Sequence, residues 1–455
     1  MFNKKESLKK GHIGTIFKEM PLHPVLNEKL NMAVLAGPKL LATRREATLP
    51  KVPGKAHAVI GIRRAGKTTF LRQLQVDWRI SQPPERVIFL GFDDDRLADL
   101  TMEQLGLVLE EYYRRYPEFR GKERVWWLLD EIQLVKGWER FVRRVLDTEQ
   151  MEIVVSGSSA RMMSREVHTS LRGRAMETII RPFSFREFLR HREAEPSGRT
   201  REFTAAERSR VEKAFREYLS VGGFPEAQGL PVELRVDLLQ GYVDTVIFRD
   251  IVERHGITQI AALRWLTRQC LRNPAGSLSV HRLHLDLKAQ GIGVAKDSLH
   301  AMMGHLQDAF LISSVTLATD SERRRNSNPR KVYPVDTGLI GAFDRSGRTN
   351  VGHALETVIL HELGRRKAEI GYVRTSEGHE VDFHVRFPDG REELIQVCAD
   401  VSSEETLKRE IRSLKDSSGD FPRARRRLLM LTFDQLPLET MKGITCQTAY
   451  EWLLT

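Results

Sequence analysis

The chain has 455 residues, of which 41% are hydrophobic and 29% charged, a composition typical of globular proteins and unlike that of disordered or fibrous ones. No apolar run approaches the roughly 18 residues of a membrane span, and the N-terminal MFNKKESLKK lacks the apolar core of a secretory signal. The three cysteines lie far apart, which argues against a disulfide framework and a CxxC-type zinc site. We therefore expect a cytoplasmic protein with several domains and no membrane partner.

The net charge of +11 is unevenly distributed along the chain. Residues 1–56 hold 11 lysines and arginines against 4 acidic residues, and residues 257–350 hold 13 against 7. Localised positive charge is typical of proteins with a polyanion partner, although a solvated basic arm and a charged loop would give the same excess. Several prolines interrupt the first segment, so we predict residues 1–56 to be a basic, partly ordered N-terminal arm.

Strand-like apolar runs separated by helical stretches follow the arm. Near-continuous apolar runs of this length, spaced by amphipathic segments, predict a buried parallel sheet in an α/β fold. After Pro182 the chain is predicted to be mostly helical to about residue 256. The predicted strands are HAVI at 57–60, RVIFLGF at 86–92, VWWLL at 125–129, EIVVS at 152–156 and ETII at 177–180.

A phosphate-binding pattern lies between the first predicted strand and a predicted helix. Residues 61–68, GIRRAGKT, fit G-x-x-x-x-G-K-[ST]. The glycines let backbone N–H groups turn toward phosphates, Lys67 reaches the β and γ oxygens, and the Thr68 hydroxyl ligates magnesium. ATP and Mg²⁺ are therefore the predicted cofactors. The predicted nucleotide-binding residues are Gly61, Arg63, Arg64, Ala65, Gly66, Lys67, Thr68 and Thr69.

The third predicted strand ends in two carboxylates, Asp130 and Glu131. Beside a P-loop, Asp130 is expected to hold magnesium through water and Glu131 to polarise the attacking water. An acidic strand end that caps a following helix is the structural alternative. We predict Thr68 and Asp130 as metal residues, and Glu131 and Lys67 as catalytic residues.

Two further catalytic candidates follow. Ser156, Ser158 and Ser159 end the fourth strand where they can sense a γ-phosphate, and we predict Ser158 as catalytic, although such serines are also ordinary turn residues. The segment LRGR then places Arg174 before the last core strand. An arginine that reaches a neighbour's γ-phosphate completes the transition-state clamp in ring ATPases, and a plain surface arginine is the alternative.

Taken together, these motifs resemble a known family. GIRRAGKTTFLRQL, FDDDRL, WWLLDEIQ, VVSGSSARMM, LRGRA, RPFSFREFL and GGFPEA follow in the order of the prokaryotic AAA+-type ATPases that carry a poorly characterised C-terminal domain. The resemblance implies an α/β P-loop AAA+ core over 57–190 and a helical lid over 191–256. It also supports Arg174 as the finger, which implies a homo-oligomer, with a hexameric ring as one form.

Residues 257–350 are predicted as three helices and a strand pair. The second and third helices are joined by a short turn at 291–293, the helix-turn-helix arrangement. The segment resembles a winged helix with a basic loop as its wing, in which the third helix enters the major groove and the wing contacts phosphate. Winged helices on ATPases also pack only against protein, and the apolar third helix favours non-specific or structure-specific DNA contact over base reading. The predicted DNA contacts are Lys296, Arg323, Arg324, Arg325, Arg330 and Lys331.

Residues 351–455 are predicted as a second α/β unit whose order of elements resembles the restriction-endonuclease-like fold. Active members carry Glu on a helix, Asp on one strand and Glu-x-Lys on the next. Glu356 and Asp382 match, whereas Gln396 and Cys398 stand where the second carboxylate and the lysine belong. Metal-dependent phosphodiester cleavage needs anionic oxygen ligands and a group that activates water. The resemblance therefore implies a degenerate nuclease site with a retained binding or assembly role.

The predicted function is ATP hydrolysis coupled to binding, moving or remodelling duplex or branched DNA, as in a helicase or translocase. Two alternatives stay open. One is a nucleotide-switched regulatory or scaffold ATPase that moves no DNA, and the other is a metal-dependent nuclease controlled by the ATPase.

Overall fold

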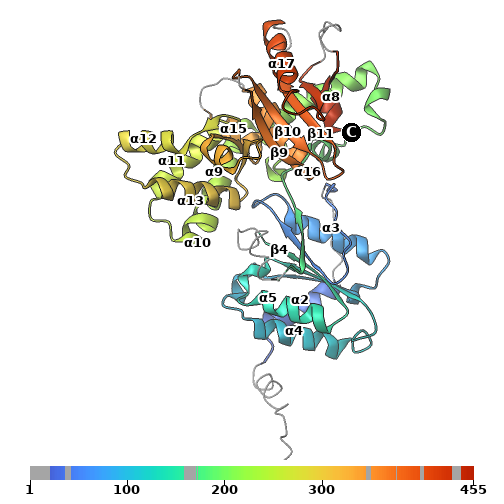
Figure 1. Ribbon diagram of the computed structural model, residues 1–455. Coiled ribbons are helices and arrows are strands. Elements are labelled where there is room, and N and C mark those ends of the chain that lie inside the picture. Colours follow the sequence, from blue (N-terminus) through green and yellow to red (C-terminus); the bar gives the residue numbers. More distant parts are fainter. Residues whose placement is uncertain are drawn as a thin grey trace, which may run out of the picture. The chain divides into compact units, whose positions relative to one another are not determined.

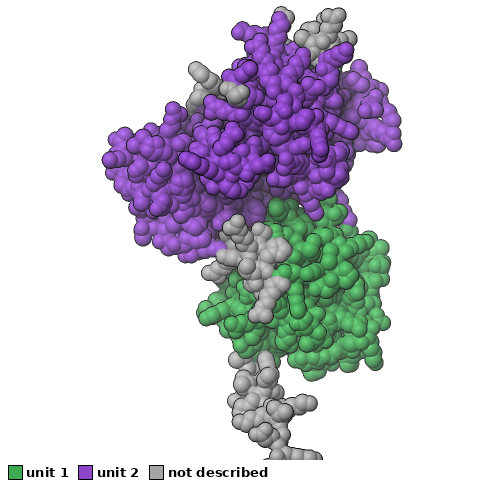
Figure 2. Space-filling view, in the orientation of Figure 1, with its two compact units in different colours: residues 1–42, 46–61, 66–180 green, residues 43–45, 62–65, 181–455 purple. Residues whose placement is uncertain are grey.

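The computed structural model describes residues 21–35, 43–157, 171, 173–344, 350–375, 377–399, 404–432 and 442–455. These residues form two units (Figure 2). None of the described helices combines the length and the apolar character that crossing a membrane requires. The first unit comprises residues 1–42, 46–61 and 66–180, and the second comprises residues 43–45, 62–65 and 181–455.

The five apolar runs of the first unit form one parallel sheet (Figure 1). The order is β2-β3-β4-β1-β5, so β1 lies between β4 and β5. Every residue of β1 is buried, as expected for an inner strand of a parallel sheet covered on both faces. The structure therefore confirms the predicted α/β fold. The strands are β1 (Ala56–Ile60), β2 (Val87–Gly91), β3 (Val125–Asp130), β4 (Met151–Ser156) and β5 (Ala175–Ile179).

Amphipathic helices accompany this sheet. Helix α5, for example, buries Trp138, Phe141, Val142 and Val145, which recur at helical spacing. Helix α3 follows the P-loop and packs against β2, β3 and β4. The helices are α2 (Pro24–Leu35), α3 (Lys67–Arg79), α4 (Met102–Arg115) and α5 (Trp138–Thr148), with short 3₁₀ turns η1 (Pro84–Arg86), η2 (Asp95–Leu97) and η3 (Ile132–Leu134).

The second unit begins with helices, as predicted. Capping boxes start α7 and α8, in which Ser184 and Thr204 exchange hydrogen bonds with Glu187 and Glu207. The elements are α7 (Phe185–His191), η5 (Thr200–Glu202), α8 (Ala205–Val221), η6 (Pro225–Ala227), α9 (Val232–Thr245), the π-helix η7 (Val246–Val252), α10 (Glu253–His255), α11 (Ile260–Arg272), α12 (Val280–Ala289) and α13 (Lys296–Asp308).

A mixed sheet of eight strands completes the second unit, in the order β13-β12-β11-β10-β9-β7-β8-β6. Strand β7 pairs with β8 and, in parallel, with β9, so strands on both sides of residue 350 share one sheet. The strands are β6 (Ser277–Leu278), β7 (Ile312–Leu317), β8 (Arg330–Pro334), β9 (Glu369–Arg374), β10 (Glu380–Arg386), β11 (Glu392–Cys398), β12 (Arg425–Met430) and β13 (Ile444–Thr448). The accompanying helices are α14 (Glu322–Ser327), α15 (Gly338–Phe343), α16 (Val351–Arg365), α17 (Glu404–Asp416) and α18 (Ala449–Leu453).

The predicted three helices and strand pair are present as α11, α12, α13, β7 and β8. Their identification as a winged helix, and the boundaries at 190, 256 and 350, stay predictions. The basic loop between β7 and β8 differs from the expected open wing, because it contains the short helix α14. The Ser321 hydroxyl caps this helix by accepting a hydrogen bond from the Arg324 N–H at 3.4 Å.

The GGFP turn at the end of α8 provides a test of the packing within the second unit. Gly222 has φ +78°, and a Cβ there would lie 1.9 Å from Asp336 Oδ1. Gly229 has a similar φ of +74° but open space around it. We expect Gly222→Ala to lower the free energy of unfolding by about 3 kcal/mol, and Gly229→Ala by only the roughly 1 kcal/mol of its backbone conformation. Urea unfolding of both variants measures this, and equal losses would contradict the packing described.

Candidate active site

The nucleotide-site candidates lie at the carboxyl edge of the first sheet. Parallel pairing sets Val59 of β1 beside Ser156 of β4, and Leu129 of β3 beside Val155. The residues that end β1, β3 and β4 therefore meet at one edge. Ligands of open α/β sheets bind outside this edge, where neighbouring strands are not consecutive in the chain.

The P-loop has the backbone of a phosphate cradle. Gly61 (φ +141°), Arg64 (φ +64°) and Gly66 (φ +95°) all have positive φ, a conformation that turns successive N–H groups toward one side. A Cβ at Gly61 would lie 2.1 Å from the Ile180 carbonyl oxygen, so only glycine fits there. Lys67 begins α3, is 5% exposed, and its ammonium donates to the Gly61 carbonyl at 3.0 Å. The predicted lysine therefore lies within the loop.

The predicted metal residues are brought together. The Asp130 carboxylate is 3% exposed and accepts hydrogen bonds from the hydroxyls of Ser156 and Thr68. Burial raises the pKa of Asp130, and these two hydrogen bonds oppose that rise. Hydroxyl and carboxylate oxygens are the ligands that Mg²⁺ prefers, so Thr68 and Asp130 fit the predicted ion.

Glu131 directly follows Asp130 in a conformation unusual for its residue type. Its φ of +53° is left-handed, a strain that persists at functional sites when the surroundings enforce it. The Glu131 N–H donates to Ser156 Oγ at 3.3 Å, and the Gln133 side-chain amide donates to the Glu131 carboxylate. Glu131 therefore lies beside Asp130 at the sheet edge, and its role as base stays a prediction.

Two arginines of the P-loop, Arg63 and Arg64, belong to the second unit and contact carboxylates within that unit. Arg63 forms two hydrogen bonds with Asp250 of η7, at 2.8 and 2.9 Å, and Asp250 is 1% exposed. Arg64 contacts Glu226 at 3.3 Å and lies over the Tyr242 ring. Because both side chains contact carboxylates, the predicted contacts of Arg63 and Arg64 with the nucleotide would be made by their backbone N–H groups.

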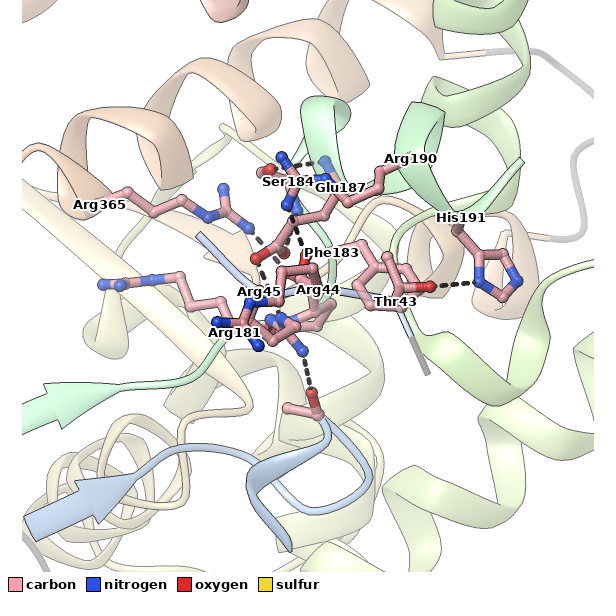
Figure 3. A network of polar contacts seen from close by, with 12 residues as sticks. Thr43, Arg44, Arg45, Arg181, Phe183, Ser184, Glu187, Arg190, His191 and Arg365 are labelled. Atoms are coloured by element: carbon pink, nitrogen blue, oxygen red, sulfur yellow. Dashed lines mark hydrogen bonds and ion pairs between the residues drawn. The ribbon is translucent and has the colours of Figure 1, made fainter. Parts of the chain in front are cut away.

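A buried arginine from outside the P-loop also contacts it (Figure 3). The Arg45 guanidinium donates to the Ala65 carbonyl at 2.7 Å and to Glu187 Oε1 at 3.0 Å. It also donates to the Arg181 carbonyl. Sequence reasoning missed this residue, since it placed Arg45 in a basic arm and found no motif around it.

The two remaining catalytic candidates are Ser158 and Arg174. Ser158 lies outside the described residues. Arg174 has a side chain 41% exposed that pairs with Asp147 of α5. To reach a neighbouring subunit's nucleotide, as predicted, Arg174 has to leave Asp147, so the finger role stays a prediction.

A second buried polar cluster lies in the second unit, around Lys331 of β8. Its ammonium contacts Glu380 at 2.7 Å, Asp382 at 3.0 Å and Glu356 at 3.1 Å, and Lys331 is 3% exposed. The Tyr333 hydroxyl donates to the same Glu356 oxygen at 2.6 Å. Burial and the nearby Asp382 raise the pKa of Glu356 to about 8. The prediction that Lys331 contacts DNA is therefore wrong, because three carboxylates bind its ammonium inside the protein.

The four degenerate-site residues are only partly brought together. The Asp382 N–H donates to Gln396 Oε1 at 3.2 Å, and Gln396 donates to Glu410 of α17 at 2.6 Å. Cys398 packs instead in an apolar cluster with Leu394, Leu407 and Met430. Of the predicted set, Glu356, Asp382 and Gln396 thus join one network of hydrogen bonds and ion pairs.

This cluster does not fit the divalent cation that a nuclease-like fold implies. A primary ammonium has three N–H donors, and Lys331 has three carboxylate acceptors around it. The second Asp382 oxygen accepts the Val397 N–H at 3.0 Å. The lysine ammonium already provides the positive charge that a metal would bring, so we derive no metal-dependent step from these residues.

The other predicted DNA contacts lie at the surface. Lys296, Arg323, Arg324 and Arg330 are exposed, while Arg325 pairs with Glu322 and donates to the Thr319 carbonyl. The structure adds a group that sequence reasoning missed. Three exposed arginines, Arg264, Arg268 and Arg272, lie at successive turns of α11 and line a hollow of about 230 Å³ beside α9. Their four-residue spacing could have revealed this stripe.

Two segments of the chain match models of known domains. Residues 53–189 match the model of an AAA domain, and residues 212–350 match a domain of unknown function (DUF8612). An uncharacterized protein of Methanocaldococcus jannaschii is 28% identical over 92% of this chain and 90% of its own length. An uncharacterized protein of Haemophilus influenzae is 26% identical over 73% of this chain and 79% of its own.

Two solved structures are similar in outline. The match to the Walker-type ATPase of Pyrococcus abyssi covers 70% of this chain and 95% of the ATPase chain, with 13% sequence identity and a TM-score of 0.40. The match to the Aeropyrum pernix ORC2 protein, solved as ADPNP–ADP complexes, covers 72% of this chain and 96% of the ORC2 chain, with 11% sequence identity and a TM-score of 0.34. The domain match, rather than these structures, supports the conclusion that residues 53–189 are an AAA domain with a P-loop.

The Lys331 cluster yields a stability prediction with a matched control on the neighbouring residue. Lys331→Met leaves three carboxylates without their cation, and we expect a loss of about 3–5 kcal/mol in the free energy of unfolding. Arg330→Met removes the same charge from the exposed first residue of β8, and should cost less than about 0.5 kcal/mol. Urea unfolding at pH 8 compares the two variants, and similar small losses would show that the cluster contributes little.

Proposed function

We propose that the protein is a Mg²⁺-dependent AAA+ ATPase that couples hydrolysis to binding and remodelling duplex or branched DNA. The observation that carries the ATPase proposal is the meeting of Lys67, Thr68, Asp130 and Glu131 at one edge of the parallel sheet. Bound magnesium would supply the positive charge that neutralises the phosphate oxygens. The protein residues would bind the phosphates, hold the ion and activate the attacking water.

The P-loop provides the binding part of the proposed reaction. Its N–H groups and the Lys67 ammonium hold the phosphates, and the first turn of α3 adds the positive end of a helix dipole. Thr68 and Asp130 would hold the ion. Glu131 orients and deprotonates the attacking water, a role that fits its position directly after Asp130.

The proposed DNA partner rests on charge. Exposed basic residues cluster in the loop around α14, at the start of α13 and along α11. The arginines of α11 recur every four residues, about 6 Å along the helix, so they present positive charge to phosphates from one face of the helix. Such contacts bind the backbone and carry no base specificity, in agreement with the predicted preference for structure over sequence.

The assembly part of the proposal rests on Arg174. Its exposed guanidinium is available to a neighbouring copy once Asp147 releases it. A homo-oligomer, with a hexameric ring as one form, would place this arginine at the next subunit's γ-phosphate. The alternative of a nucleotide-switched scaffold shares the same site and differs in being indifferent to DNA.

Phosphate release tests the ATPase proposal. We expect Lys67→Ala to abolish nucleotide binding and turnover, because it removes the charge that holds the phosphates. Glu131→Gln should lower turnover by at least about 100-fold while ATP still binds, because only the base is lost. Glu139→Gln, the same change in the first turn of α5, is the control that keeps activity. Turnover that survives Glu131→Gln would contradict the assignment of the base.

Charge reversal tests the DNA partner and locates its contacts. We expect Arg323→Glu/Arg324→Glu and Arg268→Glu/Arg272→Glu to weaken binding of a four-way junction and linear duplex. Each lost phosphate contact should reduce the slope of log K against log salt by roughly 0.9. Arg210→Glu, on the exposed face of α8, is the control. Turnover that is unaffected by single-stranded, duplex and junction DNA would favour the regulatory switch.

A further inference from the structure

Arg45 is the buried residue that links the segment before β1 to the P-loop (Figure 3). Its side chain is 4% exposed, and the Glu187 side chain with which it pairs is equally buried. The guanidinium carbon lies 5.1 Å from the centre of the Phe183 ring. A buried charge is stable only when its partners are fixed and complete, so Arg45 has one well-defined position.

The carboxylate partner of Arg45 is itself held in place. Glu187 is the third residue of α7 and accepts the Ser184 N–H at 3.0 Å, while its own N–H donates to Ser184 Oγ at 3.1 Å. This capping box fixes the Glu187 side chain against the start of the helix. The Arg181 carbonyl, just before α7, accepts a further Arg45 N–H. One guanidinium thus bridges the start of α7 and the Ala65 carbonyl.

The contact with Ala65 determines the direction of a P-loop donor. A trans peptide is planar, with its C=O and N–H pointing to opposite sides. Holding the Ala65 carbonyl on the side of Arg45 therefore directs the Gly66 N–H to the opposite side. Gly66 is the N-cap of α3, with φ +95°, and its N–H is among the groups that a P-loop offers to phosphates.

We propose that Arg45 is a positioning residue of the nucleotide site, which fixes the Ala65–Gly66 peptide in its phosphate-binding orientation. The proposal rests on the ATPase function proposed above. Only arginine suits the position, because its planar fork reaches three acceptors in different directions, whereas a lysine ammonium is a compact charge on a flexible stem. Without this contact, the peptide can rotate about the flexible φ of Gly66, and nucleotide binding has to reorder it.

Nucleotide affinity tests the proposal in the full-length protein. We expect Arg45→Met to raise the Kd for ADP and the KM for ATP about 10-fold or more, with a much smaller change in kcat. Arg45→Lys should recover part of the affinity, because it restores the charge without the full set of hydrogen bonds. Arg44→Met removes the same charge from the neighbouring, exposed position and should leave both values unchanged.

Two further variants distinguish the positioning role of Arg45 from a general packing role and from a failure of the ATPase function. Glu187→Gln disturbs the buried ion pair but leaves the Arg45–Ala65 hydrogen bond possible. If Arg45 has only a general packing role, Glu187→Gln and Arg45→Met should lose nucleotide affinity equally. Equal losses would therefore overturn the proposal. Lys67→Ala reports on the ATPase function itself. If Lys67→Ala abolishes binding while Arg45→Met and Arg45→Lys bind ADP as the unaltered protein does, only the role of Arg45 fails. If the unaltered protein binds no nucleotide, the proposed function fails with it.

Discussion

The nucleotide site depends on the parallel pairing of β1 with β4 on one side and β5 on the other. This pairing places the end of β1 against the start of the segment that follows β5, where the Ile180 N–H donates to the Ile60 carbonyl at 2.8 Å. The backbone of Ile180 then leaves no room for a side chain at Gly61. The P-loop therefore leaves the sheet through a glycine.

The elements and the motif-bearing residues were predictable because their signals are local. The strands of the first sheet are mostly apolar, and Lys67, Thr68, Asp130 and Glu131 follow or end such runs at positions that the motifs fix. Parallel pairing then brings strand ends together without further information. Arg45 and Lys331 were not predictable in this way, because their partners are distant in the chain. Glu187 is 142 positions from Arg45, and Asp382 is 51 positions from Lys331.

The error at Lys331 has a simple geometric cause. Its position after Arg330 in a basic segment suggested one charged surface, but both residues belong to β8. Arg330 is the first residue of this strand and is exposed, whereas Lys331 and the three residues that follow it are buried. Charge counted along a sequence therefore overestimates the charge available to a partner. The arginines of α11, spaced at one helical turn, show the opposite case, in which residues separated in sequence share one face.

The parallel pairing of β7 with β9 has a consequence for how this protein can be divided. A cut at residue 350, which the sequence suggests as a domain boundary, would separate two hydrogen-bonded strands of one sheet. Each fragment would present an unpaired strand edge, and the C-terminal fragment would keep the acidic residues of the cluster without Lys331. Unprotected edges invite pairing with other chains. Insolubility of such fragments would thus reflect where the chain was cut, because strands on both sides of residue 350 share one sheet.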